Sequence, residues 1–177
     1  MSNVFVIGAA GKVGKRLVKM LSGNGHKVIA LHRKPEQAQA LQACGADPVP
    51  GNLMEMNASG LAGVRRFLLV SAFPEAARGT DTSAGFENYM RVKKEADVRL
   101  ASSRLDWVIL RPGTLLDSPG TGEVRAGLAI PYGNIARDDV AAFLSALVDR
   151  PDISRQIIEL TEGDTPVEVA ASRFNAR

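Results

Sequence analysis

The strongest constraint on this chain lies at its start, where a short apolar run leads into a glycine-rich turn and then into a helical pattern. Residues 3–7 read Asn-Val-Phe-Val-Ile, which is typical of a strand buried on both faces. Residues 8–14 read Gly-Ala-Ala-Gly-Lys-Val-Gly. Apolar residues at helical spacing follow, namely Val13, Leu17, Met20 and Leu21. The order of strand, glycine turn and helix predicts a dinucleotide-binding site.

Each glycine of the turn has an expected physical role. Gly8 lets the chain leave the strand tightly, Gly11 lets the backbone approach a pyrophosphate, and Gly14 lets the helix pack closely on the sheet. The helix N-terminus adds N–H donors and a partial positive charge. A turn that binds nothing is the alternative, but the flanking strand and helix argue against it. The predicted phosphate-binding residues are Gly8, Ala10, Gly11, Lys12, Val13 and Gly14.

The residues after the second strand bear on the choice of cofactor. A strand over 27–32, a helix over 36–43 and a strand over 47–50 complete a β-α-β-α-β mononucleotide-binding half. An acidic residue after the second strand would favour NAD, but this position carries His32, Arg33 and Lys34. Because a guanidinium matches a 2′-phosphate, Arg33 predicts NADP over NAD. The alternative is that Arg33 and Lys34 belong to a solvated loop.

The rest of the chain continues the alternation of strands and helices. We expect a short helix around 58–62, strands over 67–71, 105–111 and 153–160, a small strand or loop at 130–133, a helix from Val140 and another from Pro166. Asp138 or Asp139 is interpreted as a helix cap rather than a catalytic acid. The predicted fold is α/β, with a doubly wound, parallel, Rossmann-like sheet in three layers and a single NAD(P)-binding domain over 1–177.

A long helix predicted over 86–102 carries a tyrosine and a lysine four residues apart. Tyr89 and Lys93 share one face of this helix, and that face is otherwise apolar. A lysine ammonium near a phenol would lower the pKa of the tyrosine. Such a phenol can exchange the proton that accompanies hydride transfer at a carbonyl. The alternative is a packed tyrosine beside a lysine stem that reaches solvent.

With these pieces placed, the chain resembles the atypical short-chain dehydrogenase/reductases, and within them the NmrA-like regulators and biliverdin/flavin reductases. The resemblance spans most of the chain and rests on the glycine turn, Arg33, Gly51-Asn52-Leu53, the stretch 66–71, Tyr89 with Lys93, the stretch 110–113 (Leu-Arg-Pro-Gly) and the stretch 137–141. It implies that Asn52 and Leu53 lie beside the adenine and that Pro112 borders the nicotinamide. It also implies a catalytic set of Ser71, Tyr89 and Lys93.

The sequence departs from the family pattern in two places. Asn52 stands where the family usually has aspartate, and residues 61–64 run directly into 65–67, where the family normally has a further strand and helix. The fold is therefore expected to lack one strand-helix unit. An unpaired central strand would leave buried backbone groups unsatisfied, so we expect strand 67–71 to pair in parallel with strand 3–7.

Composition narrows the function classes. The chain has 177 residues, a net charge of +3 and one cysteine, Cys44, which excludes an internal disulfide and a cysteine-based metal site. No apolar run is long enough to cross a membrane. Dispersed basic residues and 5% aromatic residues argue against nucleic-acid binding as the function. The sequence indicates a cytoplasmic protein with a small-molecule substrate and no metal, and homo-oligomer formation stays open.

Three functions compete at this point. The first is an NADPH-dependent oxidoreductase that reduces a small carbonyl, quinone or flavin-like acceptor. The second is a non-catalytic NADP-binding sensor or regulator of the NmrA-like kind. The third is a sugar-nucleotide epimerase or dehydratase, which the short chain after the last strand disfavours because little remains to build a substrate domain.

Overall fold

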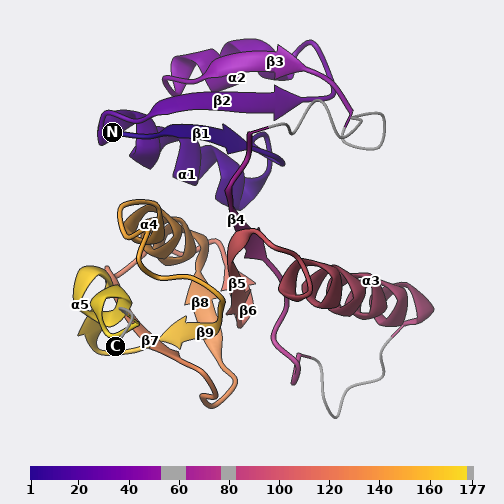
Figure 1. Ribbon diagram of the computed structural model, residues 1–177, viewed down its shortest axis with the longest axis vertical. Coiled ribbons are helices and arrows are strands. Elements are labelled where there is room, and N and C mark those ends of the chain that lie inside the picture. The colour runs from indigo at the N-terminus through magenta and orange to yellow at the C-terminus, as the bar shows by residue number, and fades with distance from the viewer. Residues whose placement is uncertain (53–62, 77–82, 175–177) are drawn as a thin grey trace. The chain divides into compact units, whose positions relative to one another are not determined.

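The computed structural model describes residues 1–52, 63–76 and 83–174 (Figure 1). The chain divides into two compact units. Unit 1 comprises residues 1–64 and 140–149, and unit 2 comprises residues 65–139 and 150–177. The short helix expected around 58–62 falls outside the described residues.

Unit 1 holds the first half of the predicted alternation. Its elements are β1 (Asn3–Val6), α1 (Lys12–Gly23), β2 (Lys27–His32), α2 (Gln37–Ala43) and β3 (Asp47–Pro50). The sheet order is β1-β2-β3, and both pairings are parallel. Parallel neighbours require a crossover, which α1 and α2 supply, so the predicted β-α-β-α-β unit is confirmed.

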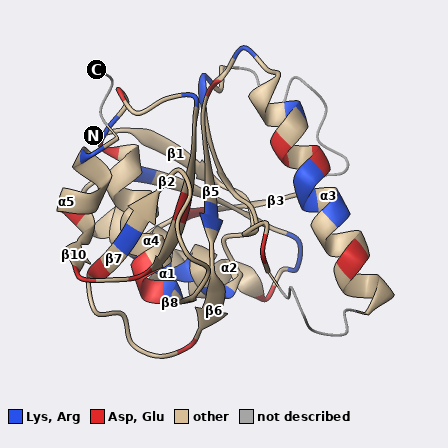
Figure 2. Ribbon diagram, turned by 90° about the horizontal axis from the view of Figure 1, so that it is seen from below, with Lys and Arg blue, Asp and Glu red and all other residues tan. Residues whose placement is uncertain are grey.

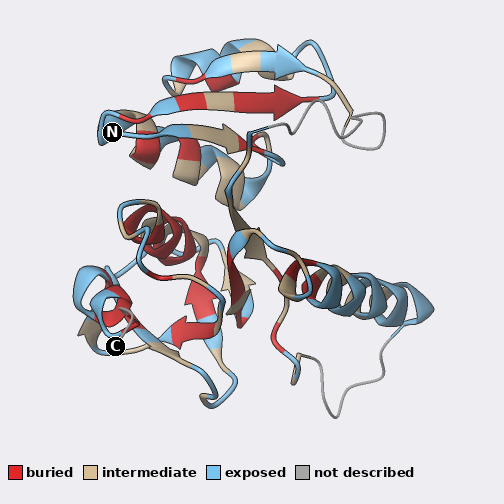
Figure 3. Ribbon diagram, viewed as in Figure 1, coloured by how far each residue is buried: buried red, intermediate tan, exposed pale blue. Residues whose placement is uncertain are grey.

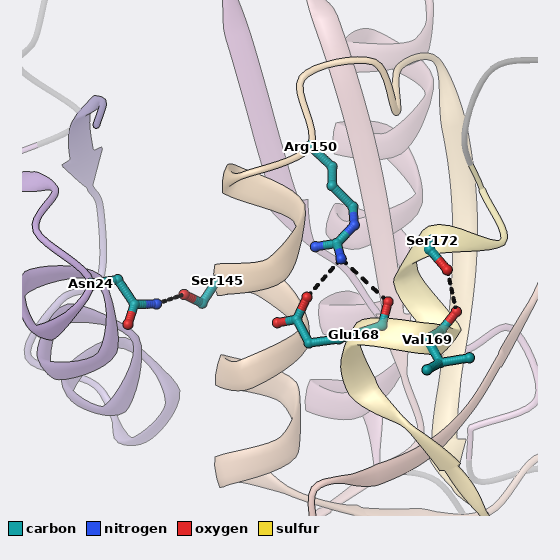
Figure 4. A network of polar contacts seen from close by, with 6 residues as sticks. All are labelled: Asn24, Ser145, Arg150, Glu168, Val169 and Ser172. Carbon is teal, nitrogen blue, oxygen red and sulfur yellow. Dashed lines mark hydrogen bonds and ion pairs between the residues drawn. The ribbon is translucent and has the colours of Figure 1, made fainter.

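The core of unit 1 is small and apolar. Fully buried side chains of α1, including Val18 and Leu21, pack with Val28 and Ala30 of β2. Helix α4 (Arg137–Val148) also contributes, because its residues from 140 onward belong to this unit. Asn24, at the end of α1, donates a hydrogen bond of 3.3 Å to the Ser145 hydroxyl of α4 (Figure 4).

Unit 2 contains the remaining strands. Its elements are β4 (Arg66–Val70), α3 (Ala84–Ala101), β5 (Asp106–Pro112), β6 (Thr114–Leu116), β7 (Glu123–Gly127), β8 (Asn134–Ala136), β9 (Gln156–Glu162), β10 (Thr165–Pro166) and α5 (Val167–Ser172). The main sheet has the order β10-β7-β9-β5-β4, with β4, β5 and β9 parallel and β7 and β10 antiparallel. Strands β6 and β8 form a separate parallel pair.

Burial within unit 2 is uneven. Trp107 and Ile109 of β5 are buried against Leu100 of α3. Most of α3 is exposed (Figure 3), and acidic and basic residues follow one another along it (Figure 2). The helix begins at Ala84, earlier than predicted, because the Ser83 hydroxyl accepts a hydrogen bond from the backbone of Phe86 and so caps it.

The expected pairing between strands 67–71 and 3–7 joins strands of different units and stays a prediction. Within unit 1, β1 pairs with β2, and within unit 2, β4 pairs with β5. Every residue of β4 is half-buried, and Val6 of β1 is buried.

Asp138 and Asp139 do not cap the helix that they begin. Both lie in the first turn of α4 and accept backbone N–H groups from the segment 120–122. Asp139 is 2% exposed, and its two oxygens bind the N–H groups of Thr121 and Gly122 at 3.1 and 2.8 Å. These two carboxylates therefore fasten a loop to the helix. The alternation of helices with mainly parallel strands confirms the α/β, Rossmann-like class.

Candidate functional site

The glycine turn of unit 1 has the backbone shape that its sequence predicts. Gly8 has φ +74°, a left-handed conformation that favours glycine. The N–H of Gly11 donates to the carbonyl of Gly8 at 2.9 Å and closes the turn. A Cβ at Gly11 would stand 3.1 Å from that carbonyl oxygen, closer than most side chains tolerate.

Gly14 is the most tightly constrained residue of the turn. A Cβ there would lie 2.3 Å from the Gly8 carbonyl oxygen and 2.8 Å from the Cα of Ala9. The sequence predicted that Gly14 lets α1 pack on the sheet, whereas the contact is with the turn itself. Gly14 thus lets the first turn of α1 close onto the chain that leaves β1.

The N-terminus of α1 is suited to an anion. Its N-cap is Gly11, which places no side-chain acceptor on the first N–H groups, and its first turn has no acidic residue. Lys12 begins the helix and is exposed. Helix N-termini attract phosphates through N–H donors and the helix dipole. The cradle that a Cβ would fill and the open helix end together fit a dinucleotide pyrophosphate.

Arg33 follows β2 on a turn that is shaped by a glutamine. The Gln37 side-chain oxygen accepts the backbone N–H groups of Arg33 and Lys34, each at 3.2 Å. Arg33 is exposed, and its guanidinium has no hydrogen bond or ion pair with any residue of the described ranges. The preceding His32 is buried, with Nδ1 3.1 Å from the Lys34 carbonyl oxygen. The turn therefore presents a free guanidinium at the carboxyl end of β2.

The remaining predicted cofactor residues are less defined. Asn52 is half-buried two residues after β3. Leu53 lies outside the described residues. Pro112 is buried at the end of β5, in unit 2.

Ser71 stands directly after β4 in unit 2. Its N–H extends the ladder to β5 by donating to the Leu110 carbonyl at 2.8 Å, and the residue is 4% exposed. Its hydroxyl is buried and has no hydrogen-bond partner within the described residues. A buried hydroxyl without a partner costs about 1–3 kcal/mol. A buried polar group without a partner calls for an explanation, and a bound group that completes its hydrogen bonding is one.

Lys93 and Tyr89 lie on α3, as the spacing predicts, but they are not joined as expected. The Lys93 ammonium donates to the carbonyl of Val70 at 2.7 Å and stands 5.6 Å from the centre of the Tyr89 ring. Tyr89 is 47% exposed and packs beside Phe86, with ring centres 6.1 Å apart. Val70 directly precedes Ser71 in the sequence, so this bond brings the Lys93 ammonium to the backbone beside Ser71.

The pKa of Tyr89 shifts in the direction opposite to the prediction. Burial of the phenol raises its pKa above the ordinary value. Burial also lowers the pKa of Lys93, and the charge of Asp97 partly opposes this. The prediction assumed that the ammonium faces the hydroxyl, but it is directed at Val70 instead. A phenol is protonated at neutral pH at its ordinary pKa as well, so Tyr89 keeps a proton to donate, but its raised pKa makes it a weaker acid.

Two contacts explain why arginine and glycine stand in the Arg-Pro-Gly stretch. Arg111 donates from Nε and Nη2 to one oxygen of the buried Asp97 carboxylate, at 3.1 and 2.9 Å. Gly113 is required because a Cβ would lie 2.0 Å from the carbonyl oxygen of Gly133. The ion pair ties α3 to β5, and the glycine lets the chain after β5 meet the segment before β8. Asp97 was not predicted from the sequence, where its only signal is an acidic residue one turn after Lys93.

Three further residues at this end of unit 2 were also missed. The hydroxyls of Thr114 and Tyr132 lie 2.6 Å apart, and the Tyr132 ring meets Phe73 edge-on with ring centres 5.2 Å apart. They come from three separate stretches, so no local spacing could have joined them. Within the described ranges, no group of three or more His, Cys, Asp or Glu residues could hold a metal ion. No helix in those ranges combines the length and apolar character needed to span a membrane.

Comparison with known proteins gives the family. A family model for NAD(P)H-binding proteins matches residues 8–59 and 55–151. An uncharacterized sugar epimerase of Bacillus subtilis is 32% identical over 213 residues, covering 97% of this chain and 99% of the relative. The chain therefore belongs to the NAD(P)H-binding family, whose members include oxidoreductases and epimerases, and the resemblance to atypical short-chain dehydrogenase/reductases is confirmed.

Solved structures agree with this assignment. A protein of Bacillus halodurans that carries the name NAD-dependent epimerase/dehydratase superposes with a TM-score of 0.86 and 27% identity, covering 98% of this chain and 99% of that one. An anaerobilin reductase of Escherichia coli superposes with a TM-score of 0.78 and 26% identity, covering 92% and 97%.

The comparisons also bear on the missing strand-helix unit. The alignment with the Bacillus subtilis relative spans 213 positions, more than the 177 residues of this chain, so the relative has residues without a counterpart here. The family model matches in two pieces that meet at residues 55–59, between β3 and β4. This is the stretch where the sequence predicts that a strand and helix are absent.

Proposed function

We propose that the protein is an NADPH-dependent reductase of a small carbonyl, quinone or flavin-like acceptor. The observation that carries the cofactor choice is Arg33, whose guanidinium has no partner among the described residues and follows β2 on a turn that the Gln37 side chain holds. A guanidinium and a phosphate form paired, charge-assisted hydrogen bonds, which an NAD ribose hydroxyl cannot match. The glycine turn and the N-terminus of α1 bind the pyrophosphate.

The family model supports treating residues 1–177 as one NAD(P)-binding domain, because its matches fall in both units. Within unit 1, Asn52 and Leu53 are proposed to contact the adenine. Within unit 2, Pro112 is proposed to contact the nicotinamide. The bound cofactor supplies the hydride.

The roles of the catalytic residues follow from their surroundings. Ser71 donates its unused hydroxyl to the acceptor oxygen, which ends the cost of burying it alone. Tyr89 supplies the proton, because its hydroxyl is protonated at neutral pH and it stands beside Lys93 on α3. Lys93 holds the end of β4 through the Val70 carbonyl and provides the positive charge at this end of the sheet.

The relatives give one alternative specific support. Two of them carry the names sugar epimerase and NAD-dependent epimerase/dehydratase. An epimerase returns its cofactor unchanged, whereas a reductase consumes NADPH stoichiometrically. A sensor of the NmrA-like kind binds cofactor and turns over nothing.

The deciding experiment follows NADPH absorbance at 340 nm with a panel of quinones, flavins and aldehydes. A reductase consumes NADPH with at least one of them. Cofactor binding without consumption, together with interconversion of a nucleotide sugar, would establish the epimerase instead. Cofactor binding with neither reaction would establish the sensor.

A further inference from the structure

Phe73, Thr114 and Tyr132 form a polar and aromatic cluster in unit 2, called here the acceptor cluster, that the proposed roles do not use. Phe73 follows β4, Thr114 begins β6 directly after β5, and Tyr132 precedes β8. Phe73 is 1% exposed and therefore fixed, and the Tyr132 ring meets it at an interplanar angle of 66°. The cluster ties together the chain after two neighbouring parallel strands.

The backbone holds Tyr132 in place. Its neighbour Gly133 accepts the N–H of Thr114 at 2.9 Å and lies where a Cβ on Gly113 would collide. Despite this support Tyr132 is 41% exposed. An aromatic residue with a fixed edge and an accessible surface loses little conformational entropy when it binds a ligand.

The hydroxyl pair provides the hydrogen-bonding capacity. Thr114 and Tyr132 each have one hydroxyl proton, and either can donate across their 2.6 Å contact. When Thr114 donates, the phenolic proton remains available to an oxygen of a ligand. Ligands of open α/β sheets bind at the carboxyl ends of the strands, where this cluster lies.

We propose that Tyr132 binds the acceptor, packing its ring on a planar conjugated molecule and donating its hydroxyl to a carbonyl oxygen. The acceptor class that this arrangement fits is a quinone or a similar conjugated carbonyl. A small aliphatic aldehyde has no planar surface to cover the ring and gains little from it. The inference rests on the proposed reductase function and narrows its substrate.

The test compares two acceptors in the full-length protein, menadione as the planar quinone and propanal as the aliphatic aldehyde. Tyr132→Leu should raise the KM for menadione about tenfold, since aromatic contact is lost with the hydrogen bond. Tyr132→Phe and Thr114→Val keep an aromatic ring at position 132 and alter only the hydroxyl pair. Each should raise the KM for menadione about fivefold or less. The KM for propanal should stay within about twofold in all three.

A binding measurement accompanies the kinetics. Menadione is titrated into each protein saturated with NADP⁺, and its dissociation constant should rise in the same order as the KM. Leu128→Ala is the control, because Leu128 lies with Tyr132 in the chain between β7 and β8 and is 71% exposed. It should leave both quantities unchanged.

The outcomes separate the two proposals. If the wild-type protein binds NADPH and menadione and Tyr132→Leu binds menadione equally well, the inference is wrong and the reductase function stands. If the wild-type protein binds no NADPH, the reductase function falls and the inference falls with it. Tyr132→Phe keeps the test decisive should Tyr132→Leu fail to fold.

Discussion

The glycine turn of unit 1 and the Ser71, Tyr89 and Lys93 set of unit 2 are positioned by different means. The turn is fixed by backbone, since a single added carbon at Gly14 would stand 2.3 Å from a carbonyl oxygen. The second set depends on side chains, and Tyr89 is 47% exposed on a helix that is mostly uncovered. Backbone constraints can be inferred from a local motif, whereas side-chain placement depends on distant packing.

Two buried serines, one in each unit, differ in whether their hydroxyl has a hydrogen-bond partner. Ser145 of unit 1 is 5% exposed and receives a hydrogen bond from Asn24 (Figure 4). Ser71 of unit 2 is equally buried, and its hydroxyl has no partner in the described part of the chain. A satisfied hydroxyl contributes to stability, and an unsatisfied one is consistent with a function. The Ser145 hydroxyl thus serves the stability of unit 1, whereas the Ser71 hydroxyl retains hydrogen-bonding capacity for a ligand.

The largest effect is expected from Tyr89→Phe, which tests whether unit 2 performs chemistry. The change keeps the ring against Phe86 and removes only the hydroxyl. Turnover should fall by about 10²–10⁴-fold, the usual contribution of a positioned general acid, with NADPH affinity nearly unchanged. Steady-state kinetics at 340 nm and an NADPH titration measure the two quantities. Undiminished turnover would show that the acceptor takes its proton from elsewhere, as a flavin or quinone can.

Gly14→Ala tests whether unit 1 depends on its backbone contact. The added carbon meets the carbonyl of Gly8 and the Cα of Ala9, neither of which can move without opening the turn. Unfolding free energy should drop by about 3 kcal/mol, and NADPH binding should weaken at least tenfold. Urea denaturation and calorimetric titration provide the measurements.

Gly23→Ala is the matched control for that substitution. Gly23 is the last residue of the same helix, and a Cβ there meets nothing within 4 Å. It should change stability by under about 1 kcal/mol, in the stabilising direction. Equal losses of stability in Gly14→Ala and Gly23→Ala would mean that the helix as a whole, and not the turn contact, is sensitive to the added carbon.

Arg33→Ala examines the cofactor preference in unit 1 alone. The probes are 2′,5′-ADP and AMP, which differ only in the 2′-phosphate and lack the nicotinamide. Wild-type protein should prefer 2′,5′-ADP by about ten- to hundredfold, and Arg33→Ala should remove most of that preference. Lys27→Ala removes an equal charge from the opposite end of β2 and should retain the preference for 2′,5′-ADP. A preference that survives in Arg33→Ala would place the phosphate contact on another residue.

The smallest effects, of opposite sign, are expected from Ser71→Ala and Ser145→Ala. Removing the unpartnered Ser71 hydroxyl should leave stability unchanged or raise it by about 1 kcal/mol, while turnover falls. Ser145→Ala deprives Asn24 of its acceptor and should lower stability by about 1 kcal/mol. Both are read from urea denaturation in the absence of ligand. A clear loss of stability in Ser71→Ala would show that its hydroxyl is already satisfied in solution.

The sequence was sufficient for those parts of the fold that local pattern determines. The strands 27–32 and 47–50 have the predicted bounds, and the chain leaves β1 in the predicted tight turn, where Gly8 is left-handed. Short strands such as β7 and β8 were missed, because they contain few apolar residues and pair with distant segments.

The candidate site was harder to predict because its properties arise from packing. Burial raises the pKa of Tyr89, and the Lys93 ammonium donates to the Val70 carbonyl at the end of β4. The contact between Thr114 and Tyr132 joins residues 18 positions apart through the fold of a loop. Neither follows from residue spacing along a helix or strand.

The central claim, that this chain binds NADPH in preference to NADH, is tested most directly by calorimetric titration of the wild-type protein with each cofactor. The account predicts saturable binding of one NADPH per chain, tighter than NADH by about ten- to hundredfold, as expected for one charge-assisted phosphate contact. Equal affinity for the two cofactors, or tighter binding of NADH, would contradict the role of Arg33 and the choice of NADPH.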